Sequence, residues 1–107
     1  MKDVKPYYLG FSHFLGIGPI KLDVLLKQYD IKDAYELPES ILSDIVGSQT
    51  GKKFAEFRSV FNPVKKLEEL RQKKIEVVSR VDSRYPEQLR ALSDAPICLY
   101  IKGNVQC

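Results

Sequence analysis

The sequence predicts a mostly α protein, with a helical domain over residues 1–73 and the first part of an α/β domain over residues 74–107. Apolar residues recur at helical spacing through the first two thirds of the chain, and prolines and glycines separate these segments. Two short apolar runs follow, typical of strands. With 107 residues, 44% of them hydrophobic, the chain can form one modest core or two small ones.

The stretch "FLGIGPIKL", residues 14–22, predicts a helix, a tight turn and a second helix. Gly16 and Gly18 can adopt a positive φ and let another backbone or a ligand come close, and Pro19 suits a first helical position. The spacing after Pro19 then predicts one buried stripe, formed by Leu22, Leu25, Leu26 and Tyr29.

A second turn of this kind is predicted at "IVGSQTGKKF". Here Pro38 opens a helix that ends at Gly47, and a short polar turn runs from Gly47 to Gly51. Lys52 and Lys53 then begin the next helix. This arrangement is a degenerate copy of the first turn.

The next helix is predicted to start at Pro63, with Asn62 as its cap and with Val64, Leu67 and Leu70 facing inward. Across the helical domain the apolar spacing predicts a shared core, formed by Phe11, Leu15, Leu22, Leu25, Leu26, Ile41, Ile45, Phe54 and Phe57.

Strands are predicted at "IEVV", from Ile75, and at "ICLYI", residues 97–101, with a short helix after Pro86 that carries Leu89 and Leu92 on one side. Continuous apolar runs on either side of a helix favour parallel strands buried on both faces. Such a pair is incomplete, so we expect the chain to be the N-terminal part of a longer protein. An unpaired strand edge would then favour self-association through the incomplete sheet.

The residues offer little support for catalysis. His13, the only histidine, lies among aromatic residues, and Cys98 lies in an apolar run, so we expect structural roles for both and make no assignment for Cys107. The two cysteines match neither a disulfide framework nor a zinc spacing, and no phosphate-binding loop is present. We therefore expect no enzyme activity, no cofactor and no metal site.

Charge and hydropathy permit contact with polyanions. The formal net charge is +3, from 17 basic and 14 acidic residues, which permits nucleic-acid binding without demanding it. No run approaches the roughly 20 apolar residues of a membrane span, and the N-terminus lacks a cleavage site, so the expected location is cytoplasmic.

The Gly-Ile-Gly turn is the main functional candidate. A turn that feeds a helix start leaves backbone amides unpaired at the positive end of the helix dipole, where an anion can bind. The pattern resembles the helix-hairpin-helix motif, which contacts nucleic-acid backbone without reading sequence. The candidate DNA-binding residues are Gly16, Ile17, Gly18, Lys21, Lys27, Lys52 and Lys53. A purely structural role, in which the glycines allow close helix packing and Ile17 fills the core, is an equally open alternative, and for the second turn it is the favoured one.

The segment "DSRYPEQLRALSDAPICLYIKGN", residues 82–104, resembles the DNA-processing protein A (DprA/Smf) family. The matching residues are Asp82, Tyr85, Pro86, Leu89, Asp94, Pro96, Leu99, Tyr100, Lys102 and Gly103. Family members precede this segment with a small SAM-like or helix-hairpin-helix domain that contains a Gly-Ile-Gly turn. Ala95 stands where the family often has a second proline.

The resemblance implies a SAM-like helical domain followed by the β-α-β start of a Rossmann-like domain. It also implies a role in binding single-stranded DNA and assisting RecA loading during natural transformation and recombination. The family's main DNA pocket lies in the Rossmann-like domain, beyond the end of this chain. The alternatives are a SAM-like protein-interaction module and a stand-alone, non-specific helix-hairpin-helix DNA-binding domain, with a Rossmann-class enzyme a distant third.

Overall fold

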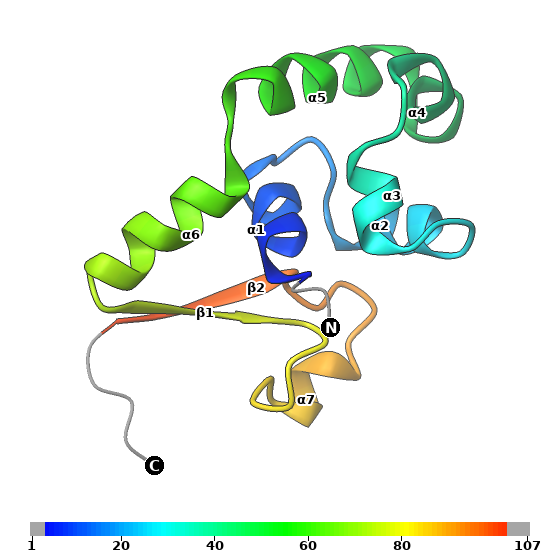
Figure 1. Cartoon of the computed structure of the whole chain (residues 1–107). Helices are drawn as coiled ribbons and strands as arrows, with labels where there is room; N and C mark the ends of the chain where they lie inside the picture. Colours follow the sequence, from blue (N-terminus) through cyan, green and yellow to red (C-terminus); the bar gives the residue numbers. More distant parts are fainter. Residues whose placement is uncertain (1–3, 103–107) are drawn as a thin grey trace.

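The computed structural model describes residues 4–102, and this part of the chain is mostly helical with one small sheet (Figure 1). Its elements are α1 (Lys5–His13), α2 (Pro19–Leu26), α3 (Ile31–Tyr35), α4 (Glu39–Val46), α5 (Ser48–Val60), α6 (Pro63–Gln72), β1 (Ile75–Ser79), α7 (Glu87–Arg90) and β2 (Cys98–Lys102). No helix in this range is long and apolar enough to cross a membrane.

The predicted turn between α1 and α2 forms, but its glycines do not use the conformation that we expected. Gly18 has a φ of −81° and is the N-cap of α2, and Pro19 is the first residue of that helix. Among the described residues, the glycine with positive φ is Gly47 instead. Neither Gly16 nor Gly18 therefore requires glycine for its φ angle.

The second turn differs from its prediction. Helix α4 ends at Val46, and α5 begins at Ser48, so Gly47 alone, at a φ of 101°, turns the chain. The expected polar turn is the first part of α5, which places Lys52 and Lys53 inside that helix. The residues "SQT" can continue into a helix because Gly47 has already reversed the chain direction.

The cap of α6 is confirmed, and α3 has a cap of the same kind that was not predicted. The Asn62 side chain accepts a hydrogen bond of 3.1 Å from the backbone N–H of Lys65, and Pro63 is the first residue of α6. At α3, Asp30 accepts a bond of 3.0 Å from the backbone N–H of Asp33. Both helices therefore begin where a short side chain can satisfy a free amide.

The two strands pair antiparallel, so the predicted parallel arrangement is wrong. Ile75 lies opposite Lys102, Val77 opposite Tyr100, and Ser79 opposite Cys98. A parallel return must carry the chain back along the full strand, about 17 Å for a strand of this length. Here the connection begins and ends at the same end of the sheet, because the Arg80 N–H donates a bond of 3.1 Å to the Ile97 carbonyl, and α7 within it is only 4 residues long.

The sheet separates two groups of buried residues. On one face, Val77 and Cys98 join the main core, which is formed largely by the helices. On the other face, Val78 packs with Tyr85 and Ala95 from the segment that connects the strands. In Figure 1, α1 and α6 lie on one side of the sheet and α7 on the other, and both α1 and α6 contact β1.

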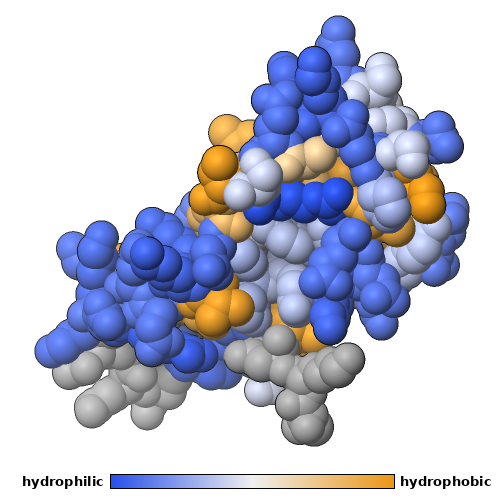
Figure 2. Space-filling model, turned by 45° about the horizontal axis from the view of Figure 1, so that its top comes forward, coloured by the Kyte–Doolittle hydropathy of each residue, from blue (hydrophilic) through white to orange (hydrophobic). Residues whose placement is uncertain are grey.

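The expected core is confirmed at its centre and wrong at its margins. Phe11, Leu22, Leu25 and Phe54 are fully buried, and Leu26, Ile45 and Phe57 are partly buried against the same core. The residues that were expected to face inward and are exposed instead are Leu15, Ile41 and Val64. Leu15 lies in the turn rather than on a helix, whereas Ile41 and Val64 lie on exposed parts of α4 and α6. Figure 2 shows a largely hydrophilic face with small, separate hydrophobic patches.

Candidate nucleic-acid interface

The turn between α1 and α2 places its apolar residue inside and its glycines outside. Ile17 is only 1% exposed and belongs to the main core. Gly16 is exposed and Gly18 half-buried, and a Cβ added at Gly18 would find no atom within 4 Å. Ile17 therefore anchors the turn, and open space lies beside Gly18 through which another molecule can approach the backbone.

The start of α2 offers free amides beside this space. The first hydrogen bond of the helix runs from the Leu22 N–H to the Gly18 carbonyl, at 3.0 Å, and no side chain caps the helix. The amides of Ile20 and Lys21 thus precede the first intrahelical donor, and Pro19 has no N–H at all. This end of α2 is suited to an anion.

The candidate lysines do not form one cluster. Lys21 lies in the first turn of α2, next to the glycines, and its side chain is exposed. Lys27 is the C-cap of the same helix, about 9 Å further along its axis. Lys52 and Lys53 belong to α5, which packs mainly on α4. The structure therefore places Lys21 beside the Gly16–Gly18 turn, Lys27 at the other end of α2, and Lys52 and Lys53 on α5.

The second candidate turn has a packing role. A Cβ at Gly51 would lie 2.2 Å from Ser43 Oγ and 2.9 Å from Ser43 Cα, so α4 and α5 approach as closely as they do only because Gly51 has no side chain. This contact supports the structural alternative for the Gly47–Lys53 segment.

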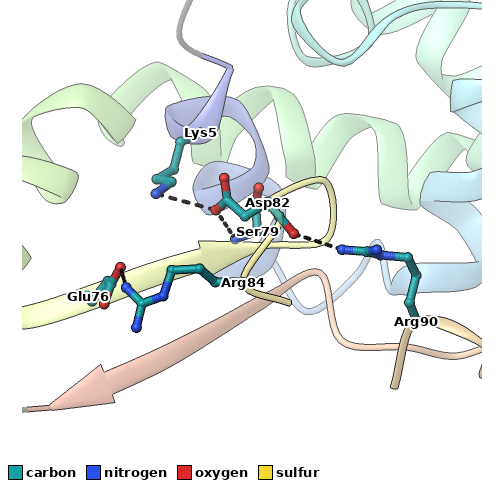
Figure 3. A network of polar contacts seen from close by, with 6 residues as sticks. All are labelled: Lys5, Glu76, Ser79, Asp82, Arg84 and Arg90. Carbon is teal, nitrogen blue, oxygen red and sulfur yellow. Dashed lines mark hydrogen bonds and ion pairs between the residues drawn. The ribbon is translucent and has the colours of Figure 1, made fainter. Parts of the chain in front are cut away.

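Asp82, part of the segment that resembles the DprA/Smf family, lies at the centre of a polar network that the sequence did not predict (Figure 3). Its Oδ2 accepts a bond of 2.8 Å from the Ser79 N–H and lies 3.3 Å from Lys5 Nζ. Arg90 donates to the carbonyls of Asp82, at 2.7 Å, and Arg80, at 3.1 Å. The network fastens the turn after β1 to α1 and α7.

Tyr85 and Arg80 extend this fastening. The Tyr85 hydroxyl donates a bond of 2.7 Å to the Pro96 carbonyl, which closes the segment between the strands. Arg80 Nη1 lies 2.9 Å from Asp23 Oδ1, an ion pair that joins this segment to α2. Asp82, Tyr85 and Pro96 thus share a structural role, which the Tyr-Pro spacing alone did not reveal.

A second unpredicted cluster joins α1 to β2. The hydroxyls of Ser12 and Tyr100 lie 2.7 Å apart, and the Tyr100 hydroxyl lies 3.3 Å from His13 Nδ1. His13 Nδ1 also lies 3.2 Å from the Leu9 carbonyl, which can only accept, so this nitrogen carries the hydrogen. No sequence signal could have found this cluster, because 88 positions separate Ser12 from Tyr100.

Burial raises the pKa of one hydroxyl and of one thiol in this region. Burial raises the pKa of Tyr100 above its ordinary value, although the hydrogen bond from Ser12 opposes the change. Burial also raises the pKa of Cys98 to about 12, so the thiol is a core group, as expected. Among the described residues, no group of three or more histidine, cysteine or acidic side chains could hold a metal ion.

A further hollow, of about 770 Å³, lies where α5 meets α6, between Tyr7, Tyr35, Arg58 and Phe61. The guanidinium group of Arg58, which lines this hollow, donates hydrogen bonds to the carbonyls of Tyr35, at 2.6 Å, and Leu37. Arg58 therefore closes the C-terminal end of α3 and is not available to a ligand in this arrangement.

Comparison of the chain with family models, with curated proteins and with solved structures found no match. The functional assignment therefore depends on the geometry of this chain and on the resemblance drawn from its sequence.

Proposed function

We propose that this chain is the N-terminal part of a DprA/Smf-like DNA-processing protein, and that it contacts the backbone of single-stranded DNA through the turn between α1 and α2. The observation that supports this proposal is the arrangement of that turn. Ile17 is buried as an anchor, while Gly16, Gly18 and the side chain of Lys21 lie at the surface around the uncapped start of α2.

The chemistry of this site fits a phosphate rather than a base. Backbone amides at a helix start carry partial positive charge, and Lys21 adds a full charge beside them. Neither group distinguishes one base from another, so binding would be independent of sequence. The absence of a side chain at Gly18 lets a phosphate come close to the amides.

The larger role comes from the resemblance. In the family, the SAM-like domain precedes a Rossmann-like domain that carries the main DNA pocket, and the whole protein assists RecA loading. For this chain we propose the accessory role, in the cytoplasm where RecA acts, without enzyme activity. Because β1 and β2 pair antiparallel, they are not the parallel β-α-β start of a Rossmann-like domain, and in this proposal they lead into that domain. Their unpaired edges favour self-association.

Binding of a fluorescently labelled single-stranded oligonucleotide tests the proposal. We expect Lys21→Glu to weaken binding clearly and Lys27→Glu to weaken it less, because only Lys21 lies at the turn. The logarithm of the association constant should fall with the logarithm of salt concentration, by roughly 0.7 for each phosphate neutralised.

Two controls separate binding from folding. Gly18→Ala should leave the free energy of unfolding within about 0.5 kcal/mol, because the space is open and the φ angle is ordinary. The same change should still weaken DNA binding, because the methyl group holds a phosphate away from the amides. Lys32→Glu, which makes the same change of charge on α3, is the matched control for Lys21→Glu. Identical titration curves for wild type, Lys21→Glu and Gly18→Ala would remove this turn from the DNA surface.

A protein-interaction module is the second candidate, and one observation favours it. Val60 is 87% exposed and Val64 is also exposed, and both border the hollow between α5 and α6. Apolar side chains at the rim of a hollow are typical of a surface that binds another protein. Failure to bind DNA, together with capture of a partner that Val60→Asp abolishes, would favour this function.

A further inference from the structure

A hollow of about 380 Å³ lies between α1, α6 and β2, apart from the turn that we propose to bind phosphate. It is lined by Ser12, His13, Lys66, Leu70, Ile75 and Tyr100. Three polar side chains converge there, because the Tyr100 hydroxyl lies 2.7 Å from Ser12 Oγ and 3.3 Å from His13 Nδ1. These contacts hold the Tyr100 ring in place before any ligand arrives.

The hollow lies at the exposed end of a row of rings. Phe57 and Phe61 stack with centroids 4.8 Å apart, Phe61 lies 5.2 Å from the His13 ring, and His13 lies 5.9 Å from Tyr100. The last ring is 44% exposed, although it lies on the sheet face that packs against α1. Tyr100 therefore offers an aromatic surface that residues 4–102 leave partly uncovered.

Two lysines, Lys66 and Lys102, belong to the surroundings of this ring. Lys66 lines the hollow, with Glu69 Oε2 at 3.8 Å from its Nζ as a weak, exposed ion pair. Lys102 stands two residues beyond Tyr100, so strand alternation places it on the same face, and it lies opposite Ile75, which lines the hollow. An exposed ring beside two lysines is the combination with which proteins hold single-stranded nucleic acid.

We propose that this hollow binds one nucleotide of single-stranded DNA, with the base stacked on Tyr100 and the neighbouring phosphates beside Lys66 and Lys102. The inference rests on the proposed DNA-binding function and deepens it by assigning a base-stacking position. Ser12 supports the connection, because it borders this hollow and also the groove that runs along Gly18 and Pro19. One strand can therefore follow the surface from the start of α2 to Tyr100.

Substitutions at Tyr100 test the stacking directly, with a labelled oligothymidylate of about 12 nucleotides as the probe. Tyr100→Ala should weaken binding by about five- to hundredfold, the range found when a stacking ring is removed. Tyr100→Phe keeps the ring and loses only the hydroxyl, so its affinity should stay within about twofold of wild type. Denaturant unfolding of each variant reports whether the fold is retained.

Lys102→Gln provides the electrostatic test. It should reduce the salt dependence of binding by roughly one neutralised phosphate, about 0.7 in slope, whereas Lys32→Gln on α3 should leave the slope unchanged. The same slope in wild type and Lys102→Gln would exclude a phosphate at this position.

The His13 ring gives a local readout that does not depend on any substitution. Because His13 is the only histidine of the chain, its ring proton resonances are unambiguous in a proton NMR spectrum. Addition of oligothymidylate should shift them, since the His13 and Tyr100 rings lie 5.9 Å apart. A shift that persists in Tyr100→Phe and disappears in Tyr100→Ala would support the stacking position.

The outcomes separate this inference from the function on which it rests. Suppose that the oligonucleotide binds and that Lys21→Glu weakens this binding, but that Tyr100→Ala does not weaken it and the His13 resonances do not shift. The stacking position is then wrong, and the DNA-binding function stands. If wild type binds no oligonucleotide at low salt, the proposed function falls, and the stacking position falls with it.

Discussion

At the scale of single residues, two buried tyrosines differ in what their hydroxyl groups contact. The Tyr85 hydroxyl donates to the Pro96 carbonyl at 2.7 Å, within the segment that joins the strands. The Tyr35 hydroxyl is buried without a hydrogen-bond partner among the described residues. It lies against Gly10 of α1, where a Cβ would come within 2.7 Å of the hydroxyl oxygen. The Tyr85 hydroxyl group therefore stabilises the fold, and the Tyr35 hydroxyl group destabilises it.

Removing each hydroxyl should show this difference. Tyr85→Phe loses a buried hydrogen bond and leaves a carbonyl unpaired, so we expect the free energy of unfolding to fall by about 1–2 kcal/mol. Tyr35→Phe removes an unpaired polar atom, so we expect no loss of stability and a gain of up to about 1 kcal/mol. Urea denaturation of both variants measures the difference. An equal loss in the two would mean that the Tyr35 hydroxyl has a partner in solution.

At the scale of elements, α2 shows how well the helical spacing predicts a buried face. The leucine pattern after Pro19 correctly places Leu22 and Leu25 inside. The same reasoning fails for Leu15, which precedes Gly16 in the turn and is 94% exposed. Helical periodicity identifies a buried face only where the backbone is helical. The backbone of the turn between α1 and α2 is not helical.

A matched pair of leucine substitutions tests this contrast. Leu25→Ala removes a fully buried side chain from the core, so it should lower the free energy of unfolding by about 2–5 kcal/mol. Leu15→Ala should change it by less than about 0.5 kcal/mol, because the side chain is already in water. Chemical denaturation of the two variants under one set of conditions is the measurement. A loss at Leu15 as large as that at Leu25 would place the turn inside the core.

The sheet is an element whose composition was predictable and whose direction was not. Both strand segments and the short helix after Pro86 formed where the sequence indicated. The direction of pairing depends on where the connection returns the chain. Hydrogen bonds from the Arg80 N–H to the Ile97 carbonyl and from the Tyr85 hydroxyl to the Pro96 carbonyl return it beside the end of β1. An isolated apolar run does not contain that information.

At the scale of the whole molecule, a buried thiol and a buried phenol make the free energy of unfolding depend on pH. Burial raises the pKa of Cys98 from 9.0 to about 12, and that of Tyr35 from 10.0 to about 12. Both groups stay neutral in the folded chain at a pH where the unfolded chain ionises them. Their contribution to the free energy of unfolding is therefore fully present below about pH 9 and is lost as the pH rises toward 12.

We expect the free energy of unfolding to decline as the pH rises above about 9, measured by urea denaturation at a series of alkaline pH values. Cys98→Ala should decline less steeply over the same range, because it removes one of the two groups. A wild-type profile that stays flat between about pH 8 and 11 would show that these groups are not buried in solution.

The sequence by itself determined most of the helices, the cap of α6 and the centre of the core. Proline and asparagine at helix starts, and leucine and phenylalanine at helical spacing, act through local backbone geometry, so they predict α2, α6 and much of the buried face without knowledge of the rest. It also indicated the Gly16–Gly18 turn and Lys21 as a candidate site. Only the tertiary structure decided the antiparallel pairing, the network around Asp82 and the meeting of Ser12 and His13 with Tyr100. These contacts join segments far apart in the chain, and their formation depends on how whole elements pack, which no local pattern of residues encodes.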